Sequence, residues 1–145
     1  MNERIVCLDI GDVRIGVAVS DPTGTIASPV EVIRRVGWGP DTQKIMAVCE
    51  RFETDRILSG LPLNMDGSAG FRAQKTARFI EQLKEHTSLP IELYDERLTT
   101  VSAHHFLQDT RTFGQKRKNI VDTLSAEIIL QDYLDRKRRK NSITS

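Results

Sequence analysis

Apolar residues near the N-terminus fall into three short runs separated by turn signals. The runs are RIVCLDI at residues 4–10, RIGVAVSD at 14–21 and TIASPVEVI at 25–33, and glycines or an Asp-Pro pair stand between them. Tight turns of this kind join neighbouring antiparallel strands. The start of the chain is therefore predicted to fold as a three-stranded meander.

Helical and extended patterns alternate in the middle of the chain. Apolar residues recur at helical spacing as far as Phe52, and Pro40 stands where a first helical turn tolerates proline, which predicts a helix over about 41–52. RILSGLP at 56–62 and IELYDE at 91–96 are short strand patterns. A second helix between them, complete before Pro90, is marked by Ala73, Ala77, Ile80 and Leu83.

The last part of the chain is predicted to be helical. Thr99 or Thr100 is a candidate cap for a third helix. A final helix is expected over about 117–136, where helical spacing places four residues on one face: Asp122, Ala126, Ile129 and Tyr133. The order of elements predicts an α/β fold, a five-stranded mixed sheet with helices on both faces and parallel crossovers to the last two strands.

Composition fits one globular domain of ordinary size. The chain has 145 residues, 39% apolar and 28% charged, and we expect a single domain over 1–138 followed by a basic, disordered tail at 139–145. No apolar stretch approaches the ~20 residues that a membrane span needs, and no signal segment precedes the first strand pattern. Cys7 and Cys49 lie within apolar patterns, which favours buried reduced thiols and a cytoplasmic protein.

The net charge of +1 hides a basic segment near the C-terminus. Residues 111–140 hold nine Lys and Arg against four acids, a local charge of +5 that leaves −4 for the rest. Such a segment is either a solvated helix end or a footprint for a phosphate backbone. If it binds nucleic acid, Lys116, Arg117 and Lys118 are the candidate contacts, because they stand about one turn before Asp122.

Three acids are candidates for one site. Asp9 ends the first strand pattern, Glu96 follows the last strand pattern, and Asp122 belongs to the apolar face of the final helix. Ligands in open α/β sheets gather at the carboxyl ends of parallel strands, so these three carboxylates are predicted to converge. Each acid alone also has an ordinary explanation as a turn residue, a surface acid or an ion-pair partner.

Clustered carboxylates repel one another and resist burial unless they are protonated or bind a cation. Oxygen ligands without Cys or His favour Mg²⁺ or Mn²⁺ over zinc. One such ion or a pair activates water and stabilises the leaving oxygen in phosphodiester cleavage. The predicted metal ligands are Asp9, Glu96 and Asp122.

Four motifs in order resemble a known family. LDIGDVRIGVAVSD, SGLPLNMDGS, YDERLTT and KRKNIVDTLSAEIILQDYLD together resemble the YqgF/RuvX family of RNase H-like, Holliday-junction-resolvase-like proteins. The family is associated with nuclease processing of the 5′ end of pre-16S ribosomal RNA. The resemblance covers nearly the whole chain and implies that Asp9, Glu96 and Asp122 are the catalytic carboxylates.

Other positions of the family pattern also match, namely Arg14, Gly16, Gly60, Pro62, Arg97 and Thr99. We expect Gly11 and Gly16 to let the backbone approach a phosphate, and Arg14 or Arg97 to hold a phosphate oxygen, with Thr99 beside them. The alternatives are that the glycines serve turns and packing and that Arg97 pairs with Asp95 or Glu96.

Aromatic residues offer a weaker signal. Trp38 and Phe113 lie near glycine-rich or basic turns and could stack on bases, although isolated loop aromatics usually serve local packing.

The leading hypothesis is a metal-dependent nuclease that acts on structured nucleic acid, in 5′-end processing of pre-16S rRNA. The alternatives are a Holliday junction resolvase acting on branched DNA and a non-catalytic module that binds nucleic acid in ribosome assembly. An actin-like or sugar-kinase ATPase shares the Asp-x-Gly turn but needs two such domains, which 145 residues do not supply. We expect nucleic acid as partner, no membrane association, and a monomer or homodimer.

Overall fold

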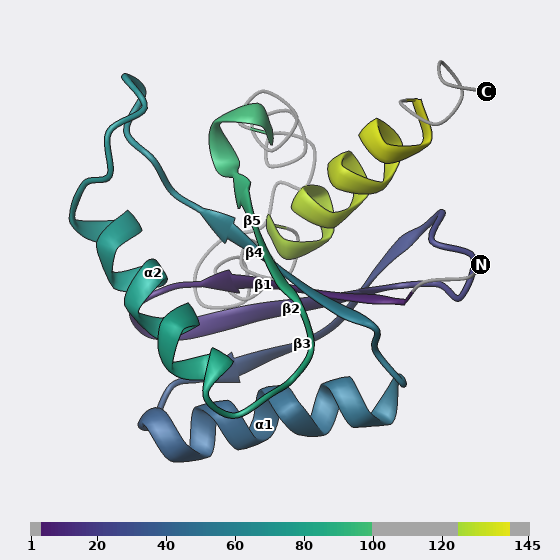
Figure 1. Ribbon diagram of the computed structural model, residues 1–145, viewed down its shortest axis with the longest axis horizontal. Helices are drawn as coiled ribbons and strands as arrows, with labels where there is room; N and C mark the ends of the chain where they lie inside the picture. Colours follow the sequence, from purple (N-terminus) through teal and green to yellow (C-terminus); the bar gives the residue numbers. More distant parts are fainter. Residues whose placement is uncertain (1–3, 100–124, 140–145) are drawn as a thin grey trace, which may run out of the picture.

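The computed structural model describes residues 4–99 and 125–139. Strands and helices follow one another in the order shown in Figure 1: β1 (Ile5–Ile10), β2 (Arg14–Ser20), β3 (Ala27–Arg34), α1 (Trp38–Arg51), β4 (Arg56–Leu61), α2 (Phe71–Lys84), β5 (Ile91–Asp95) and the single 3-10 turn η1 (Glu96–Thr99). Residues 125–139 form one further helix, here called the C-terminal helix and drawn in yellow.

The five strands form one mixed sheet in the order β3-β2-β1-β4-β5. β1, β2 and β3 pair antiparallel, whereas β4 pairs parallel with β1 and β5 pairs parallel with β4. The helices α1 and α2 provide the crossovers to the two parallel strands. The predicted meander, the crossovers and the five-stranded mixed sheet are therefore confirmed.

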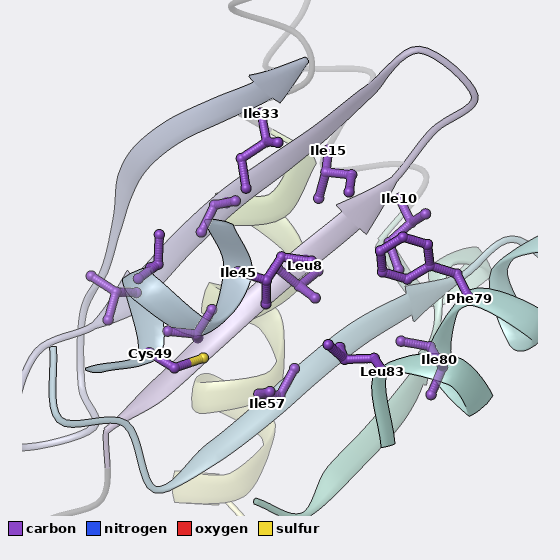
Figure 2. Close-up of a cluster of buried hydrophobic side chains, with 14 residues drawn as sticks. Leu8, Ile10, Ile15, Ile33, Ile45, Cys49, Ile57, Phe79, Ile80 and Leu83 are labelled. Carbon is purple, nitrogen blue, oxygen red and sulfur yellow. The ribbon is translucent and has the colours of Figure 1, made fainter. Parts of the chain in front are cut away.

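Each face of the sheet buries its own apolar cluster. The first face packs against α1 and α2, and Figure 2 shows its side chains, among them Leu8, Ile45, Ile57 and Phe79. The second face packs against the C-terminal helix through a separate cluster that includes Cys7 and Ala18. Helices thus cover both faces, as predicted.

The element boundaries differ from the predicted ones by a few residues for local reasons. α1 begins at Trp38, because Gly37 caps it and Pro40 fits within its first turn. β3 begins at Ala27, because the backbone N–H groups of Thr25 and Ile26 donate to the Asp21 carboxylate and close the preceding turn. The predicted third helix and the start of the final helix lie outside the described residues.

Cys7 and Cys49 are both buried free thiols, as expected from the apolar patterns around them. Among the helices of residues 4–99 and 125–139, none is long and apolar enough to cross a membrane.

Candidate active site

Asp9 stands near the end of β1, on the face of the sheet that the C-terminal helix covers. Side chains alternate between the faces of a strand. Val6 and Leu8 belong to the cluster beneath α1 and α2, whereas Ile5 and Cys7 belong to the cluster beneath the C-terminal helix. Asp9 continues the second set and is only partly buried. Apolar packing on this face therefore gives way directly to a carboxylate.

Glycines occupy the positions next to Asp9 on both neighbouring strands. Gly16 of β2 pairs directly with Asp9. On the other side Ser59 of β4 pairs with Leu8, so Gly60 comes next along the strand beside Asp9. Directly paired residues present their side chains to the same face. Neither neighbour of Asp9 on the adjacent strands therefore places a side chain of its own beside the Asp9 carboxylate.

Gly60 also makes room for the second carboxylate. A Cβ built at Gly60 would lie 2.8 Å from Ile129 Cδ1 and 3.0 Å from both Cγ and Cδ of Glu96. Real Cβ atoms essentially never approach other atoms as closely as the first distance. Glycine at this position therefore allows the Glu96 side chain and the C-terminal helix to pack directly on the backbone of β4.

Glu96 follows β5 as the first residue of η1, and its charged form is disfavoured. Burial raises its pKa to about 7, and the negative charge of Asp9 adds to the shift. Burial also raises the pKa of the Cys7 thiol, with further contributions from Asp9 and then Glu96. The two carboxylates thus act on each other and on the thiol beneath them, which places both acids at one end of this face.

This donor set fits a divalent metal ion. Asp9 and Glu96 provide hard oxygen ligands, and their mutual repulsion is the kind that a cation relieves. The raised pKa of the buried Cys7 thiol disfavours the thiolate form that would bind a metal. Within residues 4–99 and 125–139, no group of three or more His, Cys, Asp or Glu side chains is arranged to hold a metal. Asp122, the third predicted ligand, lies outside the described residues.

Basic side chains border the two acids. The positive charge of Arg72, in the first turn of α2, lowers the pKa of Glu96 and so partly offsets the effect of Asp9. Arg14 begins β2 and, two residues before Gly16, shares the face that carries Asp9. Arg72 was not among the predicted site residues, because nothing in the sequence pattern connects the start of α2 with the end of β5.

Arg97 makes an ion pair with Asp95. Its Nη2 donates to Asp95 Oδ2 at 2.7 Å and its Nε donates to both carboxylate oxygens, which lowers the pKa of Asp95 through these hydrogen bonds. Its Nη1 also donates to the carbonyl oxygen of Met65 at 3.2 Å. Of the two alternatives considered for Arg97, the pairing with Asp95 is the one that the structure contains.

Gly11 and Thr99 stabilise the two turns that carry the acids. The Gly11 N–H donates to the carbonyl oxygen of Arg14 at 2.9 Å, and a Cβ at Gly11 would lie 2.9 Å from that same oxygen. Thr99 is buried and its Oγ1 donates to the carbonyl oxygen of Glu96 at 2.9 Å. Contact of either residue with a phosphate stays a prediction, as it does for Arg14, Gly16 and Arg97.

The basic cluster of Lys116, Arg117 and Lys118 lies outside the described residues. In the described part of the C-terminal helix, Ala126 and Ile129 are buried and Tyr133 packs against the same cluster. The apolar face predicted for this helix is therefore confirmed from residue 126 onward.

Comparison with known proteins identifies relatives along nearly the whole chain. A protein of Thermoanaerobacter pseudethanolicus (strain ATCC 33223 / 39E) named "Putative pre-16S rRNA nuclease" is 46% identical over 138 residues, which is 94% of this chain and 99% of the relative. A Clostridium botulinum protein (strain Hall) of the same name is 45% identical over 132 residues, 91% of this chain and 96% of the relative.

A solved structure shares the fold. It is described as "T. thermophilus RuvC in complex with Holliday junction substrate", and it matches with a TM-score of 0.60 at 11% identity, covering 94% of this chain and 96% of that one. The fold is thus the RNase H-like fold of the RuvC resolvases. A family model described as "RuvX: Holliday junction resolvase" matches residues 3–136, and the chain therefore belongs to the RuvX family.

Proposed function

We propose that this protein is a divalent-metal-dependent nuclease that hydrolyses phosphodiester bonds of structured nucleic acid, in 5′-end processing of pre-16S rRNA. The observation that carries the proposal is the glycine-flanked pair of carboxylates, Asp9 and Glu96, at the carboxyl ends of β1 and β5. Ligand sites of open α/β sheets lie at this edge. The names of the close relatives support the choice of substrate.

Asp9 and Glu96 would hold the metal from two strands, with Asp122 as the third ligand from the final helix. When bound, Mg²⁺ or Mn²⁺ supplies Lewis-acid chemistry, activating water and neutralising charge at the leaving oxygen. Gly16 adds no side chain next to Asp9, and Gly60 lets Glu96 pack close to β4, on the strand beside Asp9. Asp9 is held in a strand of the sheet, and Glu96 in the turn that follows β5.

Cationic side chains around the acids would position the substrate. Arg72 lies close enough to Glu96 to affect its pKa, and a phosphodiester next to Glu96 would feel the same positive charge. Arg14 lies two residues before Gly16, the partner of Asp9, and on the same face of the sheet as Asp9. We keep Lys116, Arg117 and Lys118 as proposed backbone contacts, because a basic run one turn before Asp122 would flank the same site. A cytoplasmic location and a monomeric or homodimeric state belong to the same proposal.

A second candidate function is cleavage of branched DNA. The description of the matching family as a Holliday junction resolvase favours it. A third, a non-catalytic ribosome-assembly module, would keep the fold without needing Asp9 and Glu96 side by side with space for a cation.

One assay separates these functions. The full-length protein is incubated with Mg²⁺ or Mn²⁺ and, side by side, an rRNA precursor that carries the 5′ leader of 16S rRNA and a four-way DNA junction. We expect metal-dependent cleavage of the precursor at a defined position and little cleavage of the junction. Preferential cleavage of the junction would favour the resolvase, and binding without cleavage of either would favour the module. Asp9→Asn, purified in parallel, controls for contaminating nucleases.

A further inference from the structure

A cavity of about 720 Å³ lies between the first turn of α1 and the middle of α2, on the face of the sheet opposite the two carboxylates. Its lining includes Trp38 from α1, Lys75 and Arg78 from α2, and Asp12 from the turn between β1 and β2. The volume is in the range of pockets that take small molecules or single nucleotides. None of the residues already assigned to the carboxylate site lines it.

One wall of the cavity is an ordered aromatic and cationic stack. Trp38 stacks on Phe79 with the ring centroids 4.8 Å apart and the planes at 23°. The Arg35 guanidinium lies 5.0 Å from the centroid of the same Phe79 ring. Phe79 is fully buried, yet Trp38 keeps 39% of its surface exposed. A buried ring thus holds a half-exposed indole in place at the edge of a cavity.

The other wall is one side of α2. Phe71, Lys75, Arg78 and Gln82 follow one another at intervals of four, three and four residues and are all exposed, so they form a single stripe along the helix. The ring of Phe71 is 68% exposed, and the Lys75 ammonium lies 4.4 Å from its centroid. Single-stranded nucleic acid binds exposed surfaces that combine aromatic and basic side chains. The aromatic rings stack on bases, and the basic groups contact phosphates.

The stripe and the cavity are joined to the carboxylate site through the turn after Asp9. Arg35 Nη1 donates to the carbonyl oxygen of Gly11 at 2.8 Å, and Lys75 pairs with Asp12 at 3.2 Å. At the N-terminal end of the stripe, Arg72 follows Phe71, and its positive charge lowers the pKa of Glu96. A strand leaving the carboxylates would therefore pass Phe71 and Lys75 and reach the cavity beside Trp38.

We propose that this cavity, with the α2 stripe, is a subsite for a single-stranded segment of the RNA substrate next to the scissile phosphate. A splayed base stacks on Trp38, and Lys75 and Arg78 contact the backbone phosphates. The bases of a duplex are stacked within the helix and offer no free face to the indole. The inference rests on the proposed nuclease function for the identity of the RNA, but the binding itself does not depend on cleavage.

The single tryptophan of the chain makes the subsite directly observable. Full-length protein in EDTA, where no cleavage occurs, is titrated with a single-stranded RNA of roughly ten nucleotides, a length within the usual site sizes of such grooves. We expect saturable quenching of the Trp38 emission, because a base stacks on the indole. A blunt RNA duplex of the same length is expected to leave the emission unchanged.

Variants test the two kinds of contact by fluorescence anisotropy of labelled RNA. Trp38→Ala is expected to weaken binding of the single strand by about 5- to 150-fold, the range found for removal of a base-stacking aromatic, and Trp38→Phe is expected to restore part of it. Arg78→Gln is expected to flatten the dependence of log affinity on log salt by about 0.7, the value for one lost phosphate contact. Arg51→Gln, at the far end of α1, is the matched control and is expected to change neither.

Each outcome bears on the subsite separately from the nuclease. RNA that binds without quenching Trp38, or that binds Trp38→Ala and Arg78→Gln as it binds Arg51→Gln, overturns the subsite even if the wild-type protein cleaves rRNA precursor. No detectable binding of the single strand, or equal quenching by the duplex, also overturns it. Trp38-dependent binding by a protein that cleaves nothing supports the subsite and overturns the nuclease.

Discussion

Two carboxylates at opposite ends of the sheet are held in opposite ways. Asp21 follows β2 and accepts hydrogen bonds from the backbone N–H groups of Ile26 and Thr25 and from the Thr23 hydroxyl, which lower its pKa to about 2. Glu96 follows β5 at the other end, where burial and the charge of Asp9 raise its pKa to about 7. The charged form of Asp21 is therefore stabilised by its surroundings, whereas the charged form of Glu96 is destabilised.

The difference separates an acid that stabilises a turn from the two acids of the proposed metal site. Asp21 closes the turn into β3, and its negative charge is satisfied within the protein. Asp9 and Glu96 lie at the other end of the sheet, where burial and then the negative charge of Asp9 raise the pKa of Glu96, and where Gly60 lies close to Glu96. Ionisable groups whose charged form is disfavoured are typical of functional sites, since a ligand supplies the compensating charge.

The largest effect is expected from Asp9→Asn. Loss of one negative ligand removes much of the affinity for the metal, and metal ions supply several kcal/mol of transition-state stabilisation, at about 1.4 kcal/mol for each factor of ten in rate. We therefore expect cleavage to fall by at least about 100-fold, measured with rRNA precursor under single-turnover conditions.

The fold of Asp9→Asn is expected to survive. Removing one charge relieves the repulsion with Glu96, so thermal stability in EDTA should equal or exceed that of the wild type. An unfolded variant, or one that cleaves at the wild-type rate, would remove Asp9 from the proposed metal site.

Gly60→Ala is expected to have the next largest effect. Its Cβ would lie 2.8 Å from Ile129 Cδ1 and 3.0 Å from Glu96 Cδ, so the side chain of Ile129 or of Glu96 must shift. Overpacking of this kind typically costs about 1–3 kcal/mol, measurable by urea denaturation. Gly39→Ala, where no atom lies within 4 Å of the added Cβ, is the matched control. Equal stability of Gly60→Ala and Gly39→Ala would show that the position next to Asp9 on β4 does not need glycine.

Glu96→Gln tests the destabilised acid through the pH dependence of stability. The pKa of Glu96 is raised from 4.5 to about 7 in the folded protein, so its contribution to stability is fully present below pH 4.5 and is lost as pH rises through about 7. The glutamine variant carries no such loss. Without metal, it is expected to exceed the wild type by on the order of 2 kcal/mol at about pH 8 and to match it near pH 4.5.

Thermal or urea denaturation in EDTA at a series of pH values measures this difference. Mg²⁺ is expected to stabilise the wild type at about pH 8 and to leave Glu96→Gln nearly unchanged, because the ion binds the folded carboxylate pair. A wild type that is the more stable protein at high pH without metal would contradict the raised pKa.

The fold was largely predictable because local signals agreed with one another. The apolar runs before Asp9 and after Arg14 give β1 and β2, and the turn between them is short enough to fix their antiparallel pairing. Asp9 and Glu96 could be predicted at one edge, since Asp9 is near the end of one strand pattern and Glu96 comes at the end of another, and β1, β4 and β5 run in the same direction. The start of α1 was predicted a few residues late, because apolar spacing says little about a helix end capped by glycine.

The surroundings of the acids could not be predicted in the same way. Arg72 of α2 and Gly60 of β4 both lie near Glu96. This proximity depends on how the helices and strands pack together and not on any spacing along the chain. The pairing of Arg97 with Asp95 was one of two alternatives, which differ only in the direction of one side chain. For Trp38, the sequence left open both local packing and base stacking, and its stacking on Phe79 is now observed.

Asp21→Asn is expected to have the smallest effect and to complete the comparison. Asparagine keeps an oxygen that accepts from Thr25 and Ile26, so the turn should form, but it loses the charge that these donors favour. Because the pKa of Asp21 is lowered from 3.8 to about 2, the wild-type contribution is present above pH 3.8 and is lost as pH falls through about 2. The melting temperature of the wild type should therefore slightly exceed that of the variant at neutral pH, and the gap should close in acid, the reverse of the profile for Glu96→Gln. Cleavage by Asp21→Asn should equal that of the wild type, since Asp21 lies at the opposite end of β2 from Gly16 and the metal site. A gap that widens in acid, or a loss of cleavage, would mean that the two ends of the sheet do not divide structure from function.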